Sequence, residues 1–280
     1  MGFVRKQRNK INAKGMTVNG VPMNDATESQ EAVFALLADP ATHGGHAVKR
    51  VDTHAASVFL AGERALKVKR AVRFPFLDYS TLAKRKAACE TELAINRRTA
   101  PGIYRRVVAI TRENGGRLAF DGRGEPVEWV LEMHRFDEDL TLDHLAAARK
   151  IAAALADALG RTVAASHADA APADAARWIG ALESYIGEHA DAFGQRPDLF
   201  PADANRAFAD AGRETFARIR PLLVERGRTG FIRRILGDLH LGNIVLLDDR
   251  PVLFDAIEFS EVIASGDVLY DLAFLLMDLV

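Results

Sequence analysis

Three side chains in the last fifth of the chain have the types and the order needed to activate a hydroxyl group and to hold a divalent metal ion. Asp238 and Asn243 lie in the segment Gly237-Asp238-Leu239-His240-Leu241-Gly242-Asn243, and Asp255 follows further on. A carboxylate in a tight loop can accept a proton from an attacking hydroxyl, and amide and carboxylate oxygens are ligands that magnesium accepts. Either aspartate alone would be explained as a turn residue with local hydrogen bonds. Their order, each at the end of a predicted strand, favours the chemical interpretation.

The spacing of these residues is specific. Asp238 and Asn243 form the pattern D-x-x-x-x-N, which is the spacing of the kinase catalytic loop, where the aspartate receives the hydroxyl proton and the asparagine binds a metal. Val252-Leu253-Phe254 is an apolar run that ends at Asp255. A hairpin would place Asp255 across from Asn243, where the two side chains would bridge magnesium to phosphate groups.

The elements that precede residue 136 are mostly predicted strands. Thr27 to Gln30 has the form of a capping box and predicts a helix that ends before Pro40, and a second helix covers residues 82–98. Alternating and β-branched runs between turn residues predict strands at 58–60, 65–68, 107–110, 118–120 and 129–136.

The rest of the chain changes to helical periodicity. Helices are predicted at 142–168, 175–193, 205–226 and from about 267 to 280, with short strands at 232–236, 244–247 and 252–254. The sequence therefore predicts an α+β chain, in which a small sheet-plus-helix lobe precedes a larger helical lobe.

The catalytic segment resembles a known superfamily. Leu236 to Asn243 is similar to the H-G-D-x-H-x-x-N motif of the aminoglycoside phosphotransferase and choline kinase superfamily, 252–255 to its metal-binding strand, and 265–273 to its D-x-x-x-D-L-A stretch. A bacterial group described as aminoglycoside phosphotransferase-like, often fused to a P-loop ATPase domain, is more similar still. The segments that carry this second resemblance are Thr53-His54, 65–69, 76–78, 96–98 and 237–259.

The resemblance implies a protein kinase-like bilobal fold that uses ATP and Mg²⁺ to phosphorylate a hydroxyl of a small molecule. It implies an N-lobe at 26–136 with the nucleotide-binding sheet and a C-lobe at 137–280 with the catalytic and metal loops. Residues 1–25 are expected to be a disordered basic tail, because the first fourteen carry five basic residues and no acidic one. Asp238 would be catalytic, and Asn243 and Asp255 would bind the metal. A P-loop ATPase domain, separate or fused, is a further expected partner.

The resemblance also implies residues that bind the nucleotide. Lys67 corresponds to the strand lysine that contacts phosphates, and Lys69, on the same side of the strand, is its alternative. A helix carboxylate would hold this lysine. Glu90 is the choice because it shares a helix face with Leu93 and Arg97, and Glu92 is the alternative. Glu132-Met133-His134 is similar to the hinge whose backbone, at Glu132 and His134, would contact adenine.

Departures from the family pattern support a second hypothesis. Leu236 replaces the first histidine of the motif, and the expected phosphate loop, 52–57, contains no glycine. A non-catalytic nucleotide-binding or regulatory kinase-like module is therefore the alternative. A metallophosphoesterase would need further histidines to hold two metals, and no histidine follows Asn243. His240 is expected to brace the loop, and His167 to lie in a core or interface.

Composition limits the remaining classes of function. The formal net charge of −1 gives no general attraction to nucleic acid, and no run of about 18 apolar residues indicates a membrane span. With Cys89 as its single cysteine the chain needs no oxidising compartment, so a cytoplasmic location is expected. Translation could start at Met16 or Met23, and the last residue lies in a predicted apolar helix, which indicates a trimmed chain or a missing downstream segment. Acceptors from aminoglycosides to choline, amino sugars and other alcohols all remain open.

Overall fold

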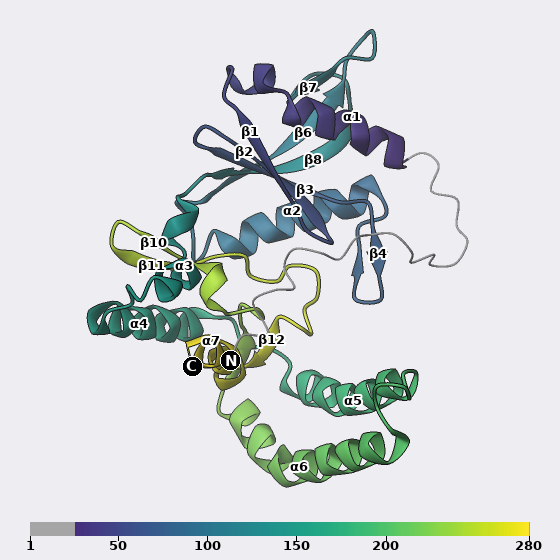
Figure 1. Cartoon of the computed structure of the whole chain (residues 1–280), viewed down its shortest axis with the longest axis vertical. Helices are drawn as coiled ribbons and strands as arrows, with labels where there is room; N and C mark the ends of the chain where they lie inside the picture. The colour runs from purple at the N-terminus through teal and green to yellow at the C-terminus, as the bar shows by residue number, and fades with distance from the viewer. Residues whose placement is uncertain (1–25, 280) are drawn as a thin grey trace.

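The computed structural model describes residues 26–279, in two lobes. A lobe built on an antiparallel sheet comes first in the chain, and a mostly helical lobe follows it (Figure 1). This arrangement confirms the predicted α+β, kinase-like bilobal class. The sheet ends at His134 and the next element begins at Glu138, while the boundary drawn between residues 136 and 137 stays a prediction. The predicted tail at 1–25 lies outside the described residues.

The N-lobe sheet presents two different faces. Its strand order is β1-β2-β3-β8-β6-β7. The strands are β1 Val48–Asp52, β2 Ala56–Ala61, β3 Arg64–Lys69, β6 Tyr104–Arg112, β7 Leu118–Phe120 and β8 Glu125–His134. On β3, Leu66 and Val68 pack with Val33 and Leu37 of helix α1 (Ala26–Ala38). Because side chains alternate along a strand, Lys67 points to the opposite face, where helix α2 lies.

Helix α2 (Leu82–Asn96) begins at a capped end and is held to the sheet by a buried ion pair. The hydroxyl of Thr81 accepts a hydrogen bond from Lys84 N–H, which caps the first turn. Arg85 Nε lies 2.9 Å from both carboxylate oxygens of Glu128 on β8, and both side chains are almost fully buried. Between β3 and α2 the chain forms a small hairpin, β4 Arg73–Phe74 and β5 Leu77–Asp78, that the sequence did not predict.

The helical lobe contains a break that the sequence did not reveal. The predicted helix at 142–168 is two helices, α3 Leu142–Ala147 and α4 Ala153–Asp169. Arg149 adopts a left-handed conformation, with φ of 56°, and the N–H of Lys150 donates to the carbonyl of Leu145, which ends α3. The other helical elements of the lobe are η2 Glu138–Leu140, α5 Ala175–Gly194, α6 Ala202–Arg228, η3 Leu241–Asn243 and α7 Val268–Leu279.

Helices α5 and α6 project from the C-lobe as a long pair (Figure 1). Their contact is apolar and includes Trp178, Ile179 and Phe216. None of the helices within residues 26–279 combines the length and the apolar character needed to cross a membrane.

Two short hairpins support the loops of the C-lobe. Strands β10 (Ile244–Leu247) and β11 (Arg250–Leu253) pair with Ile244 opposite Leu253. Asp248 and Asp249, with φ of 48° and 60°, make the two-residue turn, a conformation that aspartate tolerates. This confirms the predicted hairpin. Strand β9 (Ile232–Arg234) pairs with β12 (Ser265–Asp267), directly before α7.

Candidate active site

A cleft of about 410 Å³ lies between the two lobes. Its walls come from the loop between β1 and β2, from β3, from the end of β8 and from the segment that follows β11. Lys67, Asp238 and Asp255 all line it, so residues that are far apart in the sequence meet in one cavity.

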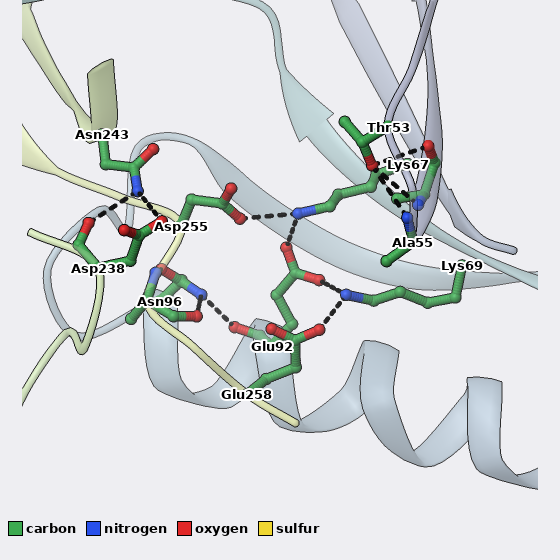
Figure 2. A network of polar contacts seen from close by, with 12 residues as sticks. Thr53, Ala55, Lys67, Lys69, Glu92, Asn96, Asp238, Asn243, Asp255 and Glu258 are labelled. Carbon is green, nitrogen blue, oxygen red and sulfur yellow. Dashed lines mark hydrogen bonds and ion pairs between the residues drawn. The ribbon is translucent and has the colours of Figure 1, made fainter. Parts of the chain in front are cut away.

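Lys67 sits between two carboxylates in this cleft (Figure 2). Its Nζ lies 2.7 Å from an oxygen of Glu92 on α2 and 2.7 Å from an oxygen of Asp255. Burial opposes the charge on Lys67, but Asp255 and then Glu92 outweigh it, and the pKa of Lys67 is raised well above its ordinary value. Lys67 is therefore a cation at every physiological pH.

The choice of Glu90 as the partner of this lysine was wrong. Glu90 points to solvent, with a side chain 55% exposed, and lies 3.5 Å from Lys86 on its own helix. The buried positions of α2 are Arg85, Cys89, Glu92 and Asn96, spaced three or four residues apart. Glu90 is two residues from Glu92 and therefore lies on another side of the helix. The 3–4 spacing through Cys89 could have identified the buried face of the helix. That face is mostly polar, however, and the face shared with the apolar Leu93 favoured Glu90 instead.

This correction predicts different effects for two matched substitutions. Glu92→Gln would leave two buried lysines with less compensating charge, and removal of one partner of a buried ion pair costs about 3–5 kcal/mol. Glu90→Gln would change the free energy of unfolding by no more than about 0.5 kcal/mol, as at other exposed sites. Urea denaturation of both variants at neutral pH measures the difference, and equal stabilities would contradict the pairing.

Lys69 belongs to a second polar cluster next to the first. Its Nζ lies 2.5 Å from Glu92 and forms an ion pair with Glu258, and its side chain is only 3% exposed. The hydroxyl of Tyr79 donates to Glu258 over 2.5 Å. Burial opposes the charge on Lys69, yet Glu92 and Glu258 raise its pKa above the ordinary value. Both partners of Lys69 are buried, whereas Lys67 pairs with Asp255, whose side chain is 41% exposed, so Lys67 is better placed than Lys69 to contact a ligand phosphate.

The raised pKa values predict how this cluster responds to alkali. A lysine whose folded pKa exceeds its ordinary value of 10.5 contributes its full stabilisation below that value and loses it as the pH rises through the folded pKa. The stability difference between the wild type and Lys69→Met should therefore stay constant from about pH 7 to 9 and shrink above about pH 10.5. Denaturant titrations across this range measure it, and a difference that already shrinks by pH 9 would contradict the assigned charges.

Helices α7 and α4 support the loop that carries Asp238. The N–H of Gly237 donates to Asp271 on α7 (3.1 Å), and Asp271 also lies 3.0 Å from His167 Nε2 on α4. Gly237 has φ of 80°, and a Cβ there would come within 3.1 Å of Ala264 Cα, so the position requires glycine. His167 is thus partly buried and contacts Asp271, the residue that bonds this loop. Leu236, which replaces the motif histidine, is 4% exposed and packs in the apolar core of the lobe.

Asp238 and Asn243 face one another across this loop (Figure 2). The amide nitrogen of Asn243 donates to the backbone oxygen of Asp238 (2.9 Å) and reaches its carboxylate at 3.4 Å. The carboxylate of Asp238 is about half exposed, at 54%, and lies 3.5 Å from His240 Nε2. His240 Nδ1 accepts a hydrogen bond from Gly242 N–H, which agrees with a bracing position.

Asp255 occupies a backbone conformation that is uncommon for residues other than glycine. Its φ is 60°, which turns the chain sharply after β11. Three successive N–H groups are held by three different elements: Phe254 donates to the backbone of Asn243, Asp255 to the hydroxyl of Tyr104, and Ala256 to the side chain of Asn96. The turn at Asp255 is therefore supported by both lobes.

The predicted magnesium ligands suit that ion. Because the amide nitrogen of Asn243 faces Asp238, its amide oxygen points away from Asp238 (Figure 2). Within residues 26–279, no group of three or more His, Cys, Asp or Glu side chains is arranged to hold a metal alone. Magnesium is usually bound by one or two protein carboxylates together with substrate phosphates and water. Asn243 and Asp255 supply an amide oxygen and a carboxylate, which are ligands that magnesium accepts.

The predicted hinge is only partly at the cleft. Met133 and His134 line the cavity. The side chain of the neighbouring Glu132 points to the other face of the sheet, where its buried carboxylate meets three arginines, and the contact of its backbone with adenine stays a prediction. The arginines are Arg64, Arg105 and Arg106. The N–H of His134 already donates to the carbonyl of Ile103 (2.8 Å), so that group is committed within the sheet.

Four residues around the lysines and Asp255 were not predicted from the sequence. Tyr79 and Glu258 belong to the Lys69 cluster, while Asn96 and Tyr104 bond the backbone after β11. Asn96 could have been found, because it continues the 3–4 spacing from Cys89 and Glu92. The other three contact residues that lie more than a hundred positions away in the sequence, and no local pattern predicts such contacts.

A bilobal fold in which a strand lysine, paired with a helix glutamate, lines one cleft with Asp238 and Asp255 has the arrangement of a kinase-like phosphotransferase. Residues 80–280 match the model of the phosphotransferase enzyme family (APH), and the chain belongs to this family.

Individual relatives share little sequence identity with this chain. Uncharacterized proteins of Mycobacterium tuberculosis (strains H37Rv and CDC 1551) and Mycobacterium bovis are 29% identical over 239 residues, which is 81% of this chain. The chain spans only 45% of the length of these relatives. Among solved structures, a choline/ethanolamine kinase family protein from Mesorhizobium loti is similar with a TM-score of 0.42 and 13% identity, covering 89% of this chain and 70% of that one.

Proposed function

We propose that this protein transfers the γ-phosphoryl group of ATP to a hydroxyl group of a small molecule. The observation that carries the proposal is the position of Lys67, which lies 2.7 Å from both Glu92 and Asp255 in a cleft that Asp238 also lines. Family membership supports the same class of reaction.

The two sides of the cleft would share the work of binding the nucleotide. Lys67 would exchange its contact with Asp255 for phosphate oxygens, while Glu92 keeps its ammonium group oriented. Asn243 and Asp255 would hold magnesium, whose charge, when it is bound, stabilises the phosphate oxygens. The cluster of Lys67, Lys69, Glu92, Asp255 and Glu258 has one more carboxylate than ammonium groups, and this surplus favours the arrival of a cation.

Asp238 would act on the acceptor. Its half-exposed carboxylate would accept a hydrogen bond from the acceptor hydroxyl and then its proton, as the hydroxyl oxygen bonds to the γ-phosphorus. The bond from that phosphorus to the bridging oxygen breaks, and ADP leaves with the electron pair. Support of the loop by Asp271 keeps this carboxylate in place.

Transfer of radiolabelled γ-phosphate from ATP tests this proposal. The purified chain would be incubated with ATP, magnesium and a panel of hydroxyl compounds that includes aminoglycosides, choline, ethanolamine, amino sugars and homoserine-like alcohols. A labelled product that requires both magnesium and one of these acceptors supports the phosphotransferase, and its identity gives the acceptor class. ATP that is neither bound nor consumed would refute it.

A non-catalytic nucleotide-binding module is the second candidate, and one observation favours it. The hydroxyl of Thr53 accepts hydrogen bonds from the N–H groups of Ala55 (3.4 Å) and Ala56 (3.0 Å). In a glycine-rich loop such N–H groups face the phosphates, but here they are satisfied within the loop (Figure 2). Calorimetric binding of ATP without turnover of any acceptor would favour this candidate.

The length of the relatives leaves room for a further domain. Because the chain spans 45% of the mycobacterial proteins, we propose that a P-loop ATPase domain, separate or fused, works with this kinase-like part. Co-expression of the two parts, with the phosphotransfer rate as the readout, tests it.

A further inference from the structure

Lys69 is a buried cation that the proposed reaction does not use. A lysine with a side chain 3% exposed is costly to bury unless its charge is compensated, and here Glu92 and Glu258 compensate it. Glu258 is itself 7% exposed and receives a second hydrogen bond from the hydroxyl of Tyr79. These contacts join the end of β3, and the segment between β5 and α2, to a residue of the C-lobe.

Glu258 lies in the irregular segment that carries Asp255. Residues 254–264 connect β11 to β12 without a helix or strand of their own, so single contacts with other parts of the chain hold their path, among them the backbone hydrogen bond from Ile257 N–H to Leu236. On the C-lobe side, Arg234 donates to the carbonyls of Ile257 (2.6 Å) and Ala264 (3.1 Å). On the N-lobe side, the carboxylate of Glu258 is held by Lys69 (Figure 2) and by the hydroxyl of Tyr79.

An aromatic row continues this contact at the outer edge. Phe76, in the turn of the β4–β5 hairpin, lies 6.0 Å from Phe259 between ring centres. Phe74 stacks on Phe76 at 5.8 Å, and His54 of the loop between β1 and β2 meets Phe74 edge-on at 5.8 Å. The segment after Asp255 thus contacts the N-lobe twice, through the buried carboxylate of Glu258 and through the ring of Phe259.

We propose that Lys69, Tyr79 and Glu258 form a clamp that sets the position of Asp255 relative to β3, with Glu258 as a positioning residue. The inference rests on the proposed function, because the alignment that matters is that of Asp255 with Lys67 and with a nucleotide-bound magnesium ion. Lys67 and Lys69 lie two residues apart on one strand and hold Asp255 and Glu258, which lie three residues apart on one segment. The ion pair between Lys69 and Glu258 therefore restrains the ion pair between Lys67 and Asp255.

Two variants test the clamp without removing a proposed ligand. Glu258→Gln removes the charge and keeps the shape, and Tyr79→Phe removes one hydroxyl. Glu261→Gln is the matched control, because Glu261 lies in the same segment, is 65% exposed, and contacts Arg234 instead of the N-lobe. Circular dichroism establishes that each variant is folded, and Tyr79→Phe decides the question if Glu258→Gln is not.

Amide hydrogen exchange in the absence of nucleotide is the first readout. The clamp predicts that exchange over residues 254–260 becomes about tenfold faster or more in both variants, with no change in Glu261→Gln. Unchanged exchange in folded Glu258→Gln and Tyr79→Phe would overturn the clamp, whatever the protein does with ATP.

The magnesium dependence of nucleotide binding is the second readout. Loss of a group that positions a metal ligand typically weakens metal affinity about 10- to 100-fold. The magnesium concentration that half-saturates binding of a fluorescent ATP analogue should rise by that factor in Glu258→Gln and by less in Tyr79→Phe, with Glu261→Gln like the wild type. Wild-type magnesium dependence in the two variants would overturn the clamp alone. If nucleotide binding by the wild type did not depend on magnesium, the proposed function would be overturned. The clamp would then have no role in binding magnesium, although hydrogen exchange would still test whether it holds the segment.

Discussion

Replacement of Asp238 by asparagine is expected to lower phosphotransfer by about 10²- to 10⁴-fold, the usual contribution of a positioned acid or base. Asparagine keeps the size of the side chain but cannot accept the hydroxyl proton. Asp238 is 54% exposed, so the substitution removes no buried charge, and the free energy of unfolding should change by less than about 0.5 kcal/mol. Initial rates with saturating ATP and acceptor measure the effect.

A matched substitution separates this role from a general effect of lost charge. Asp249 lies in the exposed turn of the β10–β11 hairpin with φ of 60°, a conformation that asparagine also tolerates. Asp249→Asn should have the rate and stability of the wild type. Turnover of Asp238→Asn at the level of Asp249→Asn would show that the carboxylate of Asp238 takes no part in the reaction.

Replacement of Asp255 by asparagine is expected to have an effect of comparable size through a different step. The charge stabilisation provided by a catalytic metal is worth several kcal/mol, so a weakened site should lower turnover by about 10³-fold. Lys67 would keep Glu92 as its partner, and asparagine accepts φ of 60°, so the fold should persist. Calorimetry of ATP binding with and without magnesium measures the loss.

The pattern across metal concentrations distinguishes the two variants. Asp255→Asn should bind ATP with little dependence on magnesium, and high magnesium should restore part of its rate. Asp238→Asn should bind ATP and magnesium as the wild type does and fail only in transfer. An Asp255→Asn protein with unchanged magnesium dependence would remove Asp255 from the metal site.

The parts of the site that the sequence could predict are local. The D-x-x-x-x-N spacing, the hairpin of the strands predicted at 244–247 and 252–254, and the apolar run before Asp255 all lie within one stretch, and short-range patterns determine such hairpins and loops. The structure places Asp238 and Asp255 in one cleft, with Asn243 bonded to Asp238, while their chemical roles stay proposals.

The parts that the sequence could not predict depend on distant contacts. The glutamate that pairs with Lys67 was misplaced because the buried face of α2 is polar there, so apolar spacing indicated the wrong side. Gln30 is a second example. The capping-box interpretation assigned its side chain to the helix end, but the amide instead bonds the backbone of Lys69 and Ala71 and the carboxylate of Glu128. A polar residue that is buried by tertiary packing follows the partners it meets there.

A structure of the protein with magnesium and a non-hydrolysable ATP analogue tests the central claim most directly. We expect a magnesium ion about 2.0–2.1 Å from the amide oxygen of Asn243 and from a carboxylate oxygen of Asp255. Lys67 should have left Asp255 for the phosphates while keeping Glu92, and the terminal phosphate should face Asp238. A nucleotide bound outside the cleft, or an ion that neither Asn243 nor Asp255 contacts, would contradict it.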